Sequence, residues 1–133
     1  MTRQQIFDAV VEHFIKQGAP AVIQHGASEI TCCYRTPDGL KCAIGALIPD
    51  ELYTPEMEGA AALVVLRVYP LAGKAVGLSK SNEKLFEALQ EAHDAAATDT
   101  YGNSAFLPRL WVCMRRVAED FKLNTSKIPG DGA

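Results

Sequence analysis

Cysteine and histidine are the most reactive side chains in this 133-residue chain, which has four cysteines and three histidines. Cys32 and Cys42 fall on one apolar face of a predicted hairpin, and His13 and His93 fall on the apolar sides of two predicted helices. Two thiolates and two imidazoles form a ligand set that suits zinc. One interpretation is therefore a zinc-stabilised or cysteine-dependent small enzyme that uses Cys32, Cys42, His13 and His93.

The spacing of these residues favours a simpler interpretation. The ligands of a structural zinc site usually come in short pairs along the chain, and that pairing is absent here. Free cysteine readily buries as a small hydrophobe. A core histidine can be satisfied by hydrogen bonds to the backbone or to a neighbour such as Asp94. We therefore expect reduced, metal-free thiols and no cofactor.

Cys33 is the best candidate for a cysteine nucleophile. We expect it on the polar face of the hairpin with Arg35 and Lys41, and His13 or His93 would have to act as the base. Such a thiol must be partly exposed and ionised in an electropositive setting. Neighbouring cations are more often ordinary solvated charges. Because no complete catalytic motif accompanies Cys33, we expect a binding protein rather than an enzyme.

Other classes of function lack their signatures. No phosphate-binding glycine fingerprint is present, and the His93-Asp94 pair lacks the further histidines that a metal-dependent phosphohydrolase needs. The formal net charge of −3 argues against nucleic acid or an anionic membrane as the main partner. The N-terminus has no apolar signal-peptide core, and the apolar stretch at 60–66 is too short to span a bilayer. These features predict a cytoplasmic protein.

The hairpin that positions the cysteines is predicted by its turn. Thr36-Pro37-Asp38-Gly39 suits a type I turn closed by a glycine at positive φ. The predicted strands are 30–35 and 40–45, with Tyr34 opposite Cys42. This register gives one apolar face, made of Ile30, Cys32, Tyr34, Leu40, Cys42 and Ile44. The polar face, which carries Arg35 and Lys41, is then the displayed surface.

Helical periodicity fills most of the remaining chain. The pattern predicts a capped helix from Thr2 to Gly18, a short extended piece at 21–23, a helix start at 49–52, a helix from Pro55 through Leu66, a connection at 73–81, a helix over 85–92, a loop at 95–104 and a last helix over 106–121. Two strands alone are marginally stable, so they must lie against helices. We expect an α+β fold, mainly helical, with four or five helices packed on a two-stranded antiparallel β-hairpin. The predicted boundaries are a single globular domain at 1–123 and a flexible tail at 124–133.

The middle of the chain carries a resemblance. The motifs are CYR at 33–35, DGLKCAIGALIPDELY at 38–53 and PEMEG at 55–59. With them the chain resembles a family of small uncharacterised bacterial and bacteriophage proteins. The resemblance implies a phage or prophage origin and brings no catalytic assignment.

We therefore expect an accessory or regulatory protein that acts by protein–protein interaction with a host or phage protein, and a homo-oligomer remains an alternative. Its candidate binding surface comprises Arg35, Lys41, Tyr53 and Glu58.

Overall fold

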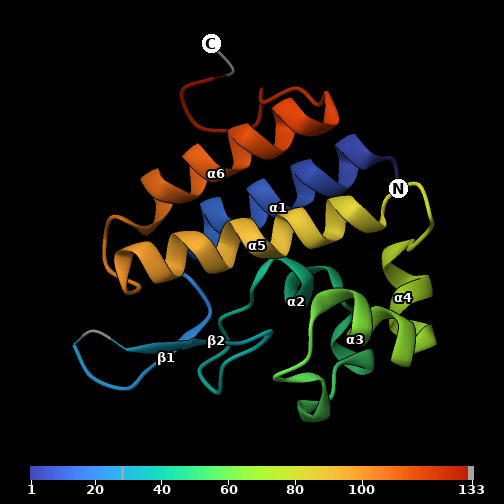
Figure 1. Cartoon of the computed structure of the whole chain (residues 1–133), viewed down its shortest axis with the longest axis horizontal. Helices are drawn as coiled ribbons and strands as arrows, with labels where there is room; N and C mark the ends of the chain where they lie inside the picture. The colour runs from blue at the N-terminus through green and yellow to red at the C-terminus, as the bar shows by residue number, and fades with distance from the viewer. Residues whose placement is uncertain (28, 132–133) are drawn as a thin grey trace.

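The computed structural model describes residues 1–27 and 29–131, which fold into helices around one small sheet (Figure 1). The described residues form α1 (Arg3–Gln17), β1 (Val22–Gln24), β2 (Ile30–Cys32), α2 (Ala43–Leu47), the 3₁₀ turns η1 (Asp50–Leu52) and η2 (Pro55–Met57), α3 (Ala62–Val68), α4 (Pro70–Val76), α5 (Glu83–Thr100) and α6 (Phe106–Phe121). The predicted fold class is confirmed: the chain is mainly helical and carries one two-stranded antiparallel sheet.

The long helices α1, α5 and α6 lie alongside one another and contribute much of the core (Figure 1). The capping box predicted at Thr2 is present: its hydroxyl accepts from the Gln5 amide at 3.1 Å, and the Gln5 side chain accepts from the Thr2 amide at 2.8 Å. On α6 the predicted apolar stripe is buried, with Leu110 and Met114 fully enclosed. Burying such a side chain contributes about 1.5–3 kcal/mol. This packing gives the sheet a firm platform.

The sheet itself differs from the expected pairing. β2 pairs with β1, in the register Val22↔Cys32, Ile23↔Thr31 and Gln24↔Ile30, instead of with a strand at 40–45. The predicted strand 40–45 is therefore wrong. The short extended piece expected near 21–23 supplies the partner strand. Only a short loop separates it from β2, so the two strands can pair antiparallel.

The turn at the end of the predicted hairpin is nevertheless correct. The Gly39 amide donates to the Thr36 carbonyl at 3.0 Å, and Gly39 has a φ of 90°. Arg35 and Lys41 form an isolated antiparallel bridge, and the Cys42 amide donates to the Tyr34 carbonyl at 3.0 Å. The predicted register, with Tyr34 opposite Cys42, is confirmed at the tip.

Beyond Cys42 the chain turns into α2 because Cys42 acts as its N-cap. The Cys42 sulfur accepts the Gly45 amide at 3.3 Å, which satisfies one of the free donors at the start of the helix. The pairs Cys33–Ala43 and Cys32–Ile44, to which the predicted register would extend, therefore do not form. Cys33 is also not on a displayed face, since only 8% of it is exposed.

Three other boundaries need correction. The helix predicted from Pro55 through Leu66 is interrupted at Gly59, which has a φ of 84°. The helix α4 begins at Pro70 and runs to Val76, so the first residues of the predicted connection at 73–81 are helical. The first part of the predicted loop at 95–104 is helical, since α5 runs to Thr100 and buries Thr100 on the same side as its core residues. Alanine is a strong helix former even where the apolar pattern fades.

The predicted flexible tail packs against the domain as far as the structure describes it. Ile128 is buried in the core, and Asp131 accepts two hydrogen bonds from Arg115, at 2.9 and 3.0 Å. The last two residues of the predicted tail, 132 and 133, lie outside the described residues. Across the described part of the chain, no helix has the length and apolar character needed to cross a membrane.

Candidate functional site

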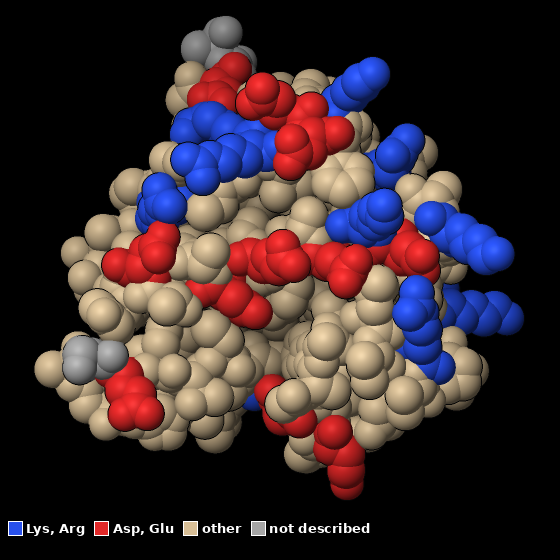
Figure 2. Space-filling model, in the orientation of Figure 1, with Lys and Arg blue, Asp and Glu red and all other residues tan. Residues whose placement is uncertain are grey.

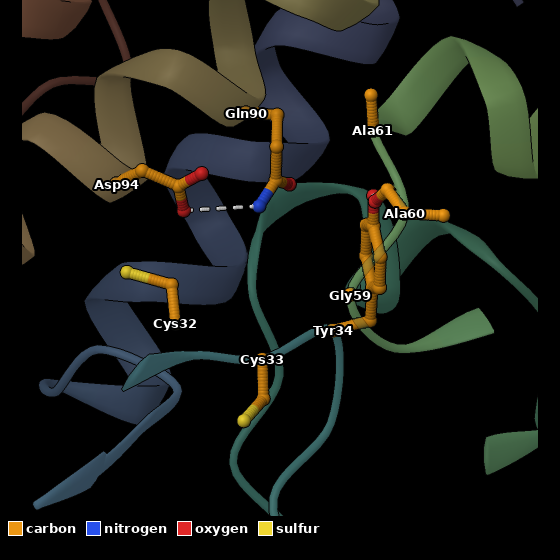
Figure 3. Close-up of a pocket in the computed structure, with 8 residues that line it drawn as sticks. All are labelled: Cys32, Cys33, Tyr34, Gly59, Ala60, Ala61, Gln90 and Asp94. Carbon is orange, nitrogen blue, oxygen red and sulfur yellow. Dashed lines mark hydrogen bonds between the residues drawn. The ribbon is translucent and has the colours of Figure 1, made fainter. Parts of the chain in front are cut away.

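A groove runs between two segments of the chain, 30–37 and 58–62, and ends on α5. It consists of three adjoining cavities of about 260, 680 and 180 Å³. The first and second share Cys32, Cys33 and Gly59 in their linings, and the first and third share Tyr34 and Asp94 among others, so the three are neighbours. Figure 3 shows the central part: the Cys32 side chain points toward Asp94 of α5, and Tyr34 lies against Ala60.

One carboxylate joins the walls of this groove. Glu58 Oε1 accepts from the Tyr34 amide at 2.8 Å, and Glu58 Oε2 accepts from the Arg35 amide at 3.0 Å and from the Tyr53 hydroxyl at 2.6 Å. The Tyr34 hydroxyl donates to the Ala60 carbonyl across the same gap. Burial and the neighbouring Glu58 carboxylate raise the pKa of Tyr53, so its hydroxyl stays a donor. Hydrogen bonds to a charged acceptor are the stronger kind, so Glu58 holds the walls in place.

Three of the four residues predicted as a binding surface, Arg35, Tyr53 and Glu58, line the second cavity, although Arg35 is turned inward. Only 13% of the Arg35 side chain is exposed. Its guanidinium donates to the Ile48 carbonyl at 2.6 Å, forms an ion pair with Asp50 at 2.7 Å, and lies 4.9 Å from the centre of the Tyr53 ring. Lys41 reaches the same Asp50 carboxylate at 3.2 Å. Arg35, Tyr53 and Glu58 therefore brace the groove, whereas Lys41 lines none of the three cavities and keeps 32% of its side chain exposed.

The predicted zinc ligands are only partly assembled. Cys32 and His93 meet, and Asp94 joins them, with one potential ligand atom from each residue within 4.8 Å of the others. Cys42 instead caps α2, and His13 Nε2 lies 3.1 Å from the Lys41 carbonyl oxygen. Burial lowers the pKa of His13, which keeps its imidazole neutral.

The hydrogen bonds of His93 oppose metal binding at this cluster. His93 is fully buried, and its Nε2 accepts from the Ala21 amide at 3.0 Å. Its other nitrogen, Nδ1, therefore carries the proton and donates to Asp94 at 2.8 Å. A metal on Nδ1 would displace this proton and break the bond to Asp94, and the ring would be left without any proton while Nε2 still accepts. This arrangement matches the hydrogen-bonded core histidine that we expected from the sequence.

Gln90 is a site residue that sequence reasoning missed. It is buried, its carbonyl accepts from the Ile44 amide at 3.1 Å, and its amide donates to Asp94 at 3.1 Å (Figure 3). It thereby links α5 to the start of α2 and orients Asp94. The available signal was the spacing of Gln90 and Asp94, four residues apart and so on one face of a helix.

The cysteines of the groove are protonated thiols. Burial and the nearby Asp94 carboxylate raise the pKa of Cys32 to about 12. Burial and Glu58 raise the pKa of Cys33, and burial raises that of Cys42 to about 12. A thiol must ionise to attack an electrophile. The position beside Arg35 that made Cys33 the best nucleophile candidate therefore does not activate it, because the Arg35 charge is directed to Asp50.

The end of the groove on α5 is acidic. Glu87 and Glu91 are exposed there, and Asp94 is partly exposed. Figure 2 shows acidic side chains in a row across the middle of this face, where Figure 1 places α5. Among the described residues, neither Glu87 nor Glu91 takes part in an ion pair.

Comparisons of this chain with protein-family models, with curated proteins and with solved structures gave no match.

Proposed function

We propose that this protein is a small accessory or regulatory protein of the phage or prophage type, which acts in the cytoplasm by binding a host or phage protein in the groove and has no catalytic activity. The observation that carries the proposal is the groove itself, with both walls already joined by Glu58. A site that is formed before its ligand arrives avoids part of the ordering cost of binding.

The state of the reactive groups also favours binding over catalysis. The His93 ring is engaged at both nitrogens, and the thiols of Cys32 and Cys33 have raised pKa values. A general base or nucleophile needs a free lone pair near the reacting atom. The imidazole of His93 and the thiols of Cys32 and Cys33 are instead hydrogen-bonded or protonated.

A zinc-stabilised or cysteine-dependent enzyme is the second candidate, favoured by the approach of Cys32, His93 and Asp94 to one another. It would require the bond from the Ala21 amide to His93, or the bond from His93 to Asp94, to open. Metal analysis of the purified protein separates the two candidates. About one tightly bound zinc per chain would favour the second.

Site-specific photocrosslinking tests the binding proposal. A photoreactive amino acid replaces Ile23 or Pro55, which are exposed and line the largest cavity, and replaces Val112 on α6 as the control. Figure 1 places α6 and the hairpin on opposite sides of α5. We expect both groove positions to crosslink to the same protein in host extract while the Val112 variant does not. Equal crosslinking at all three positions, or none at the groove, would contradict the proposal.

A further inference from the structure

The outer edge of β2 has free backbone groups. The Cys33 amide donates to the Ala21 carbonyl at 2.9 Å and the His25 amide donates to the Glu29 carbonyl at 2.8 Å, so the bonds between β1 and β2 fall on odd-numbered residues. The N–H and C=O of Cys32 therefore point away from β1. No hydrogen bond from the rest of the described chain reaches either group.

This free edge faces the groove. Tyr34, two residues further on, directs its amide the same way, and that amide meets Glu58. Gly59 follows Glu58 and lines the first two cavities together with Cys32. The groove is therefore bordered on one side by a strand edge that is unpaired at Cys32, since the outward groups of Tyr34 are taken by Glu58 and by the Cys42 amide. Unpaired strand groups are a template for another extended chain.

The acidic residues around the groove would select which side chains an added strand carries. In a strand, alternate side chains point to the same face, and Cys32 directs its side chain toward Asp94 on α5. A strand added beside β2 would direct every second side chain to that same side. Glu87, Glu91 and Asp94 are spaced four and three residues apart, so they share one face of α5. Glu87 and Glu91 are about 6 Å apart along the helix axis. Alternate side chains of a strand repeat at about 6.6 Å.

We propose that the groove binds an extended segment of the partner protein, which pairs with the free edge of β2 at Cys32 and carries Lys or Arg at alternate positions facing Glu87, Glu91 and Asp94. This inference rests on the proposed function and names the chemistry of its ligand. The backbone pairing supplies the alignment, and the charges supply the selectivity.

Selection from a library of random short peptides, displayed and washed at low salt, tests the inference. We expect the selected peptides to carry Lys or Arg at alternate positions. The double variant Glu87→Gln/Glu91→Gln should bind them about tenfold more weakly, since each exposed ion pair contributes modestly. The control is Glu119→Gln/Asp120→Asn on α6, which removes the same amount of charge from exposed residues elsewhere and should leave the affinity unchanged.

Backbone methylation of a selected peptide tests the strand pairing separately. N-methylation at the positions that face β2 removes the donors for the Cys32 carbonyl and should weaken binding about tenfold or more. Methylation at the intervening positions should cost much less. Equal losses in the two series would overturn the strand-pairing part of the inference.

The outcomes separate this inference from the proposed function. If the selected peptides lack basic residues, or bind the Glu87/Glu91 variant as well as the natural protein, the inference is wrong. The proposed function still stands in that case if the groove positions crosslink to a partner. A dimer in light scattering that peptide addition dissociates would make a second copy of this chain the occupant, and would also overturn the inference.

Discussion

Gly45 lies so close to Tyr34 that a methyl group on Gly45 would overlap the Tyr34 carbonyl oxygen. This contact lets α2 begin directly under the hairpin tip, where that same carbonyl accepts the Cys42 amide. We expect Gly45→Ala to lower the free energy of unfolding by about 3 kcal/mol, because the overlap is with rigid backbone. Gly39→Ala is the control: it meets no atom and only adopts an unfavourable positive φ, so it should cost about 1 kcal/mol. Urea unfolding that gives equal losses for the two variants would contradict this account.

Among the carboxylates of the groove, Glu58 should be the one whose replacement lowers stability most. Replacing it with alanine leaves two backbone amides and the Tyr53 hydroxyl without their acceptor. We expect Glu58→Ala to lower the free energy of unfolding by about 2–4 kcal/mol. Glu56→Ala is the matched control, since Glu56 is exposed two residues away and should leave stability nearly unchanged. Thermal unfolding followed by circular dichroism measures both, and similar melting temperatures for the two variants would show that Glu58 does not hold the walls.

Cys42 should make the protein less stable at alkaline pH. Its thiol has an ordinary pKa of 9.0 and a folded-state pKa of about 12, raised by burial. The thiol's favourable contribution is therefore complete below pH 9 and is lost as the pH rises toward 12, because the unfolded chain ionises first. The slope should reach about 1.4 kcal/mol per pH unit. In Cys42→Ala the free energy of unfolding should fall less steeply over this range than in the natural protein. Parallel curves would mean that the thiol ionises equally in both states.

Much of the fold could be predicted from the sequence because its signals are local. The Thr2 capping box, the turn ending at Gly39 and the apolar stripe of α6 each depend on residues a few positions apart. The pairing of β2 could not be predicted in the same way. Tyr34 and Arg35 fit a strand that continues along the hairpin, but the sulfur of Cys42 starts a helix instead, and cysteine is not a common N-cap residue.

The candidate site was harder to predict than the fold because its contacts are long-range. His93 bonds to the Ala21 amide 72 residues away, and Gln90 bonds to the Ile44 amide 46 residues away. No periodicity encodes such contacts. The sequence did identify His93 with Asp94 and the set Arg35, Lys41, Tyr53 and Glu58 as residues of interest. What it could not show is that these side chains are turned toward one another.

His93 should stabilise the protein without any metal. Its ring stacks on Phe14 with centroids 5.5 Å apart, lies 5.8 Å from the Phe106 centroid, and joins Ala21 to Asp94. We expect His93→Ala to lower the free energy of unfolding by about 3 kcal/mol, through the lost packing and the buried Ala21 amide left without its acceptor. The exposed His25 gives the control, His25→Ala, which should have little effect.

Zinc and a chelator complete that test. Added zinc should not raise the melting temperature of the natural protein, and a chelator should not lower it, since metal binding would cost existing hydrogen bonds. A melting temperature that falls with the chelator and recovers with zinc would contradict the metal-free account of Cys32 and His93.

Trp111 and Val112 are neighbours on α6, but truncation to alanine should lower stability strongly at Trp111 and hardly at Val112. Trp111 is buried with 8% exposure and belongs to the main core, while Val112 is 36% exposed. We expect Trp111→Ala to lower the free energy of unfolding by about 3–5 kcal/mol, because it removes a large side chain and leaves a cavity that the helices cannot fully close. Val112→Ala should change stability by less than about 0.5 kcal/mol. Two measurements decide whether the face of α6 that carries Trp111 is core or an interface. They are denaturant unfolding of both variants and light scattering of the natural protein and of Trp111→Ala. Unchanged stability of Trp111→Ala together with a loss of self-association would make the face an interface between copies of the chain.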